Sequence, residues 1–193
     1  MIKREPTTIT PILILPPNVK GVAQANKFIH SAGNYNGCTI ACDPIIWQGI
    51  VKFEVIFENT AQYDKRIGIA DASCLFDADE EPQIAENQNN TVRYWFNGIL
   101  DHITDGPKNN QCFKDNQKVT AEIDMISNPK KLTFFVDDVE QINRVINIPP
   151  QIRFWVFISN PSSSFTITKF EHCFESSAKG VKDSKNWEWG KIW

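Results

Sequence analysis

The sequence predicts an all-β fold, a sandwich of two antiparallel sheets with little helix. Short segments alternate between apolar and polar residues with the period of two that is typical of half-buried strands, most clearly in VKFEVIF (51–57) and KVTAEIDM (118–125). Asn97-Gly98 separates two strand-like segments and is a strong short-range signal of a type I′ hairpin. The 3.6-residue period of a helix is almost absent, and only GVAQANKFIHSA (21–32) is expected to form a short helical turn.

The first half of the predicted sandwich contains one long strand and one hairpin. In VKFEVIF, residues Val51 and Phe53 begin an apolar face that lies opposite lysine and glutamate. The hairpin joins TVRYWF (91–96) to ILDHI (99–103), and we expect Tyr94 to point into the core, which leaves Trp95 on the opposite face.

The second half raises the question of two adjacent carboxylates. KLTFFVDDVEQ (131–141) runs from an apolar strand into Asp137-Asp138. Adjacent strand residues point to opposite sides and do not readily share a proton, so we interpret the pair as a hairpin turn rather than a catalytic dyad. RFWVFIS (153–159) is apolar at nearly every position, which predicts a central strand with Trp155 in the core. SFTITKFE (164–171) alternates again.

Length, composition and charge limit the classes of function. The 193 residues suit one domain, which we divide into an extended N-terminal arm (1–20), a β-sandwich (21–175) and a tryptophan-containing C-terminal tail (176–193). The net charge of -3 provides no basic field for nucleic acid. The apolar run Ile12 to Leu15 is too short for a signal peptide or a membrane span, so we expect no membrane partner and a cytoplasmic location.

The cysteines predict neither a disulfide framework nor a metal site. They are odd in number and scattered, and the histidines lie far apart, so four convergent zinc ligands are not indicated. We expect reduced thiols, no metal and no cofactor. The cysteines are Cys38, Cys42, Cys74, Cys112 and Cys173.

The order of these segments resembles the SPRY domain family, a bent antiparallel sandwich related to concanavalin-like lectins. RIGIADAS (66–73) resembles the family's IG(I/V)A strand, and the Asn97-Gly98 hairpin and KLTFFVDD follow in the family's order, over about residues 35–172. The chain departs from the family at Asp115-Asn116-Gln117, where Gly-Asp is usual, and at Asp137-Asp138, where Asn-Gly is usual. Both departures keep residues that favour tight turns.

The resemblance implies protein or peptide recognition by loops at one end of the sandwich, after the IGIAD strand (73–90) and after the penultimate long strand (160–164). The first loop is acidic, which favours a basic partner segment, although a solvated acidic loop explains the same residues. The candidate contacts are Asp77, Asp79, Glu80, Glu81, Asn160, Ser162 and Ser163. Candidate aromatic anchors, which interfaces favour, are Tyr63, Trp95, Trp187, Trp189 and Trp193. The three tail tryptophans either pack on the chain's own sandwich or dock into a partner.

One short motif resembles part of an enzyme active site. AEIDMIS (121–127) is similar to the catalytic strand of laminarinase-type glucanases at Glu122 and Asp124, but Ser127 stands where the acid/base glutamate is required. We therefore predict a non-catalytic recognition module for a protein segment. A carbohydrate-binding lectin-like or degenerate glucanase-like sandwich stays open as an alternative, and so does a structural subunit of a larger assembly.

Overall fold

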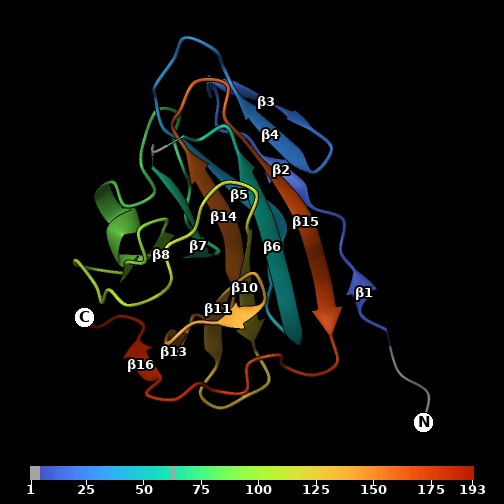
Figure 1. The fold of residues 1–193 in the computed structure, drawn as a ribbon, viewed down its shortest axis with the longest axis vertical. Helices are drawn as coiled ribbons and strands as arrows, with labels where there is room; N and C mark the ends of the chain where they lie inside the picture. The colour runs from blue at the N-terminus through green and yellow to red at the C-terminus, as the bar shows by residue number, and fades with distance from the viewer. Residues whose placement is uncertain (1–4, 62–63) are drawn as a thin grey trace.

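The computed structural model describes residues 5–61 and 64–193, which form two packed β-sheets (Figure 1). The larger sheet has the order β16-β13-β11-β10-β6-β15-β4-β3, with β1 on β15 and β12 on β11; the smaller has the order β2-β5-β14-β7-β8-β9. This is the predicted two-sheet sandwich, and in the described part the only helix is the 3-10 turn η1 (Ala85–Asn89). The strands are β1 Thr7–Thr8, β2 Ile12–Ile14, β3 Gly21–Gln24, β4 Lys27–His30, β5 Cys38–Ile46, β6 Ile50–Glu58, β7 Lys65–Asp71, β8 Thr91–Trp95, β9 Leu100–Asp101, β10 Lys118–Asp124, β11 Lys131–Val136, β12 Val139–Glu140, β13 Asn143–Ile146, β14 Ile152–Ile158, β15 Ser164–Cys173 and β16 Lys185–Glu188.

The alternating residues of the predicted strands form the core between the sheets. Phe53 of β6 stacks on Phe154 of β14 with ring centroids 4.7 Å apart, which joins the two sheets at the centre. Tyr94 is fully buried, as predicted, and so is Trp155. Trp155, however, lies on the other face of β14, in a second apolar cluster outside the main core.

Both predicted hairpins are present, but one has a different turn. The Asp137 and Asp138 φ angles are 48° and 65°, the left-handed pair that a type I′ turn requires. The Asp137 carboxylate accepts hydrogen bonds from Lys118 N at 2.9 Å and Gln117 Nε2 at 2.7 Å, so the pair is structural. At Asn97-Gly98 the type I′ prediction is wrong.

The turn between the hydrogen-bonded residues Trp95 and Ile99 has three residues, 96–98, rather than two. Gly98 N donates to Trp95 O at 3.0 Å and Trp95 N donates to Ile99 O at 2.9 Å, and of the Asn97-Gly98 pair only Gly98 has a positive φ, 87°. A turn closed by one left-handed glycine is the usual three-residue hairpin loop.

The predicted helical turn at 21–32 is wrong, because this segment forms the β3–β4 hairpin. Gly21 pairs with His30 and Gln24 with Lys27. In β4, Phe28 and His30 are buried while Lys27 and Ile29 are half-buried, so this strand follows the period of two.

The predicted arm and tail are both paired with the sandwich. β1 adds to β15 of the larger sheet and β2 adds to β5 of the smaller, so the N-terminal segment links the two sheets along one edge (Figure 1). β16 pairs with β13 in parallel, and Trp189 and Trp193 pack against the core. The tail therefore packs on its own chain.

The cysteines are free thiols, as predicted. Burial raises the pKa of Cys38 to about 11 and that of Cys42 to about 12, so both thiols are protonated and unreactive at neutral pH. Across residues 5–61 and 64–193 no helix has the length and apolarity needed to cross a membrane.

Candidate binding site

The outer face of the smaller sheet is covered by a long loop, residues 72–90, that follows β7. Trp155 and Phe157 of β14 point away from the main core into this face, where Phe76 of the loop packs on Trp155 with ring centroids 6.1 Å apart. Gly68 of β7 allows the Trp155 ring to lie directly on the strand, because a Cβ at Gly68 would be 2.5 Å from Trp155 Cζ2. The loop is thus fixed to the sheet by aromatic packing.

A buried arginine holds the tip of the loop. Arg66 is 1% exposed, and its Cζ lies 3.4 Å above the Trp95 ring. Its Nη2 donates to Glu81 Oε2 at 2.8 Å and its Nη1 to Gln83 Oε1 at 2.6 Å, while Asp64 accepts from the same guanidinium. Although burial alone would raise the pKa of Glu81, the hydrogen bond and charge of Arg66 lower it. Glu81 is therefore an internal ion-pair partner.

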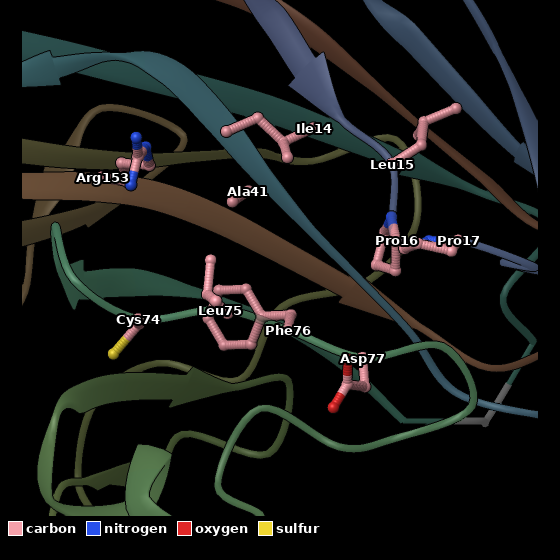
Figure 2. A pocket seen from close by; sticks show the side chains of 10 residues that line it. All are labelled: Ile14, Leu15, Pro16, Pro17, Ala41, Cys74, Leu75, Phe76, Asp77 and Arg153. Atoms are coloured by element: carbon pink, nitrogen blue, oxygen red, sulfur yellow. The ribbon is translucent and has the colours of Figure 1, made fainter.

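An apolar hollow of about 310 Å³ lies between this loop and the N-terminal arm. Figure 2 shows the arm residues on one side, Cys74 to Asp77 on the other, Ala41 of β5 between them and Arg153 at one end. The hollow is lined by Ile14, Leu15, Pro16, Pro17, Ala41, Cys74, Leu75, Phe76, Asp77 and Arg153. Leu75 is 82% exposed, so a large apolar side chain stands in water at the margin of a largely apolar hollow.

Arg153 brings the main polar donor to this hollow. Its Nε donates to Asp43 Oδ1 at 2.6 Å and its Nη1 to Ala72 O at 2.5 Å, which fixes the guanidinium plane. The second terminal nitrogen, Nη2, has no hydrogen bond to the described residues, so it is available to a ligand oxygen.

A second, more polar hollow of about 370 Å³ adjoins the first and shares Cys74, Leu75 and Asp77 with it. Its lining includes the carboxylates of Glu80 and Glu86. Asp77, Glu80 and Glu86 make no ion pair within the part of the chain that the structure describes. The acidic side chains that face solvent here are thus Asp77 and Glu80 of the predicted set, with Glu86, which sequence reasoning did not select.

The two predicted binding loops do not lie at the same end of the sandwich, so this part of the prediction is wrong. β7 and β14 are antiparallel, with Ile152 opposite Asp71 and Ile158 opposite Lys65, so the loops that follow them leave from opposite ends of the sheet. The long loop then crosses the outer face, and Thr39 Oγ1 donates to Glu80 O at 3.1 Å near its tip. Asp79, also exposed, bridges to Gly37 through the backbone. The hollows therefore lie on a face of the sandwich, whereas the prediction placed the site at one end.

The turn after β14 offers few free side chains. Asn160 Nδ2 donates to Asn59 O at 2.8 Å, and the fully buried Ser163 donates through its hydroxyl to Asn160 O at 2.6 Å. Ser162 is exposed, with a φ of 60°. Ser163 is thus inaccessible to a partner.

The predicted aromatic anchors are mostly engaged within the chain. Trp95 is half-buried beneath Arg66 and donates through Nε1 to Asp101 Oδ2 at 2.9 Å. In the tail, Trp187 Nε1 donates to Asn143 Oδ1 at 2.9 Å, while Trp189 and Trp193 contact the His102 ring. Tyr63 lies outside the described residues.

The glucanase-like motif is closed by the tail. Glu122 is 2% exposed, and its carboxylate accepts hydrogen bonds from Ser176 Oγ at 2.5 Å and Ser177 N at 3.0 Å. Glu122 lies on the outer side of β10, as the alternation of KVTAEIDM indicates, but the tail covers the side chain and keeps it from solvent. Asp124 caps the turn that follows, where its Oδ1 accepts from Ser127 N at 2.9 Å.

Several solved structures that superpose on this fold are SPRY domains. The SPRY domain of human HERC1 superposes with a TM-score of 0.60 at 13% identity, covering 81% of this chain and 94% of that one. The fold is that of SPRY domains. The TRIM65 PSpry domain, at a TM-score of 0.55 and 12% identity, covers 89% of this chain and 90% of its own.

The same SPRY-like sandwich also resembles a lectin fold. The metal-free carbohydrate recognition domain of Emp46p superposes with a TM-score of 0.50 at 12% identity, covering 84% of this chain and 87% of that one. No protein-family model matches the sequence, and no curated protein matches it either.

Sequence reasoning identified the loop wall of the apolar hollow and missed the arm wall. The run Ile12 to Leu15 was recognised as too short for a membrane span, and its place beside the loop depends on the pairing of Ile14 with Ala41 across the sheet. The sequence does contain a signal for this wall: Pro11, Pro16 and Pro17 flank the apolar run. Because proline is confined to edge strands, such a run is expected at the edge of a sheet, where its apolar side chains are accessible.

Proposed function

We propose that this SPRY-like sandwich is a non-catalytic recognition module that binds a segment of another protein in the apolar hollow between the arm and the 72–90 loop. The observation that carries the proposal is the hollow itself, which is rimmed by the highly exposed Leu75. Exposed apolar area next to a concave surface is typical of a protein-binding site. The HERC1 and TRIM65 domains share the fold, which supports a binding role by analogy.

The site chemistry favours binding over catalysis. The three buried carboxylates of the described residues all have partners within the chain: Glu54 accepts from Thr168 Oγ1, Glu122 from Ser177 N and Asp101 from Arg93 Nε. Free buried thiols such as Cys42 and Cys74 suit a reducing compartment, which supports our proposal that the chain acts in the cytoplasm.

Selection of peptides from a random phage-displayed library tests this function. The wild-type protein is expected to enrich peptides that bind it in solution, and Leu75→Asp is expected to weaken that binding about tenfold or more by placing a charge at the apolar rim. Ile126→Asp is the matched control, because Ile126 is 70% exposed and lies outside the hollow. Equal binding by both variants would contradict the proposal.

Carbohydrate binding is a second candidate function, favoured by a different hollow. About 210 Å³ lies on the outer face of the larger sheet, lined by Lys52, Glu54, Thr120, Phe135, Asp138, Lys169 and Ser177. This lining contains both hydrogen-bond donors and acceptors. Lys169 Nζ lies 3.6 Å from Glu54 Oε2, which is too long for a direct hydrogen bond, so the ammonium protons of Lys169 can be donated to a hydroxyl-rich ligand. The lectin-like fold of Emp46p supports this candidate.

A glycan array probed with the wild-type protein and with Lys169→Met distinguishes the two candidates. Glycan binding that Lys169→Met removes, and that Lys182→Met at an exposed tail position leaves intact, would favour the carbohydrate function. An array without signal would leave the peptide-binding proposal as the single candidate.

A further inference from the structure

The two adjoining hollows have different chemistry, and one segment of the loop divides them. Leu75 and Asp77 belong to both. On the arm side the lining is aliphatic, aromatic and proline, whereas on the other side it contains Glu80, Glu86 and two asparagines. A ligand that crosses Leu75 therefore meets an apolar environment first and an acidic one next.

The acidic side is suited to a basic side chain rather than to a metal ion. The Asp77, Glu80 and Glu86 side chains are exposed, and they are not paired with any lysine or arginine of the described chain. No group of three metal-ligating side chains comes together anywhere in the described ranges. Carboxylates spread around a hollow still attract a mobile cationic side chain, which reaches them one at a time through charge-assisted hydrogen bonds.

The apolar side has one well-placed donor. Arg153 is held by Asp43 and Ala72 with Nη2 left over, at one end of the hollow that Figure 2 shows. Because the Arg153 charge is already balanced by Asp43, a neutral acceptor such as a peptide carbonyl fits this position better than a second carboxylate. An extended segment provides such a carbonyl beside every side chain.

We propose that the ligand of this site is an extended protein segment with a large aliphatic or aromatic residue followed closely by lysine or arginine. The apolar side chain enters the hollow between Ile14 and Phe76, a backbone carbonyl accepts from Arg153, and the basic residue passes Leu75 to the carboxylates of Asp77, Glu80 and Glu86. The proposal rests on the protein-binding function above and specifies which segments that function selects.

Two variants with equal charge change test this ligand class. The first neutralises the acidic hollow with Asp77→Asn, Glu80→Gln and Glu86→Gln, and the second neutralises Asp105, Glu175 and Asp183, three exposed acidic residues outside it. Dissociation constants are measured by fluorescence anisotropy, at low and high salt, for library-selected peptides and for versions with the basic residue changed to alanine.

The expected result is a roughly five- to tenfold weaker binding of the basic peptide to the first variant and no change for the second. The alanine peptide is expected to bind both variants and wild type alike, with little salt dependence. Leu75-dependent peptides that lack a basic residue, or that bind the first variant unchanged, would overturn this ligand class and leave the protein-binding function standing. Absence of any Leu75-dependent peptide would overturn both.

Discussion

His102 links the β8–β9 region to the C-terminal tail through a bond that only its neutral form makes. The ring is fully buried, with Nδ1 2.7 Å from Thr91 O and Nε2 2.9 Å from Gly190 N. A carbonyl accepts and an amide N–H donates, so the proton is on Nδ1 and Nε2 is the acceptor. Burial lowers the pKa of His102; the bond to Thr91 opposes this effect and the charge of Arg93 adds to it.

Stability is therefore expected to fall on acidification. The unfolded chain takes up a proton near pH 6.5, whereas folded His102 resists it, so the free energy of unfolding decreases as pH falls below about 6.5 toward the lower folded pKa. Protonation also puts a donor against Gly190 N–H, which favours release of the tail tryptophans. Thermal melts and tryptophan fluorescence between pH 7.5 and 5 measure both effects. His102→Gln should flatten the slope and His172→Gln should retain it; the opposite pattern would assign the slope to another group.

Gly68 is a residue at which the replacement of one hydrogen atom by a methyl group decides stability. A Cβ there would lie 1.9 Å from Val92 O and 2.5 Å from Trp155 Cζ2, and neither the strand nor the buried ring has room to move. Gly68→Ala is expected to destabilise the fold by about 3 kcal/mol or more, which lowers Tm by roughly 6–12 °C. Gly33→Ala is the comparison: no neighbour lies within 4 Å, and only its φ of +71° is strained, at a cost of about 1 kcal/mol. Similar melts for the two variants would contradict this account.

At the scale of elements, the β11–β12 turn allows the effect of backbone strain to be measured separately from the effect of a side-chain hydrogen bond, because two adjacent residues share the strain and one of them makes the bond. Both aspartates have left-handed φ angles, but the Asp137 carboxylate alone caps Lys118 N. Asp138→Gly is expected to raise the free energy of unfolding by about 0.5 kcal/mol by removing strain. Asp137→Gly relieves the same strain and loses the cap, so it is expected to destabilise. Urea titrations of the two variants give the comparison, and stabilisation by Asp137→Gly would show that the cap contributes nothing.

The tail behaves as an element of the sandwich, so its removal has a predictable cost. Deleting residues 181–193 removes β16, leaves the edge of β13 unpaired and exposes the faces that Trp189 and Trp193 cover. We expect a loss of about 2–4 kcal/mol, seen as a lower Tm. An unchanged Tm would mean that the tail contacts add nothing in solution.

Elements that depend on local sequence could be predicted, whereas strand pairings between residues far apart in the chain could not. The alternation in β6 and β10 and the Asp137-Asp138 turn are readable because a strand or a turn depends on neighbours in sequence. The β3–β4 hairpin was mistaken for helix because Val22, Ala25 and Ile29 are spaced three and four residues apart, as on one face of a helix. The parallel pairing of Val145 with Trp187 joins residues far apart in the chain, and no local pattern encodes it.

At the scale of the whole molecule, the candidate site exists because two distant segments meet on one face. The loop after the IGIAD strand (73–90) is the predicted binding loop, and its acidic residues Asp77 and Glu80 line a hollow. Glu81 was selected with them and is instead committed to Arg66, which only the fold reveals. The opposite wall comes from the arm, whose strands β1 and β2 fasten to different sheets.

This double attachment allows stability and binding to be separated by truncation. Deleting residues 1–10 removes β1 and the bond from Ile9 N to Phe170 O, but it leaves β2 on β5 and keeps Ile14 to Pro17 in the wall. Deleting residues 1–17 removes that wall as well. The shorter deletion is expected to lower Tm while peptide affinity stays within about twofold of wild type, whereas the longer one is expected to reduce affinity at least tenfold at a temperature where both remain folded. Circular dichroism establishes folding, and anisotropy with the same selected peptides gives affinity. Full affinity after removal of residues 1–17 would show that the loop binds without the arm, and the apolar hollow would then have no part in recognition.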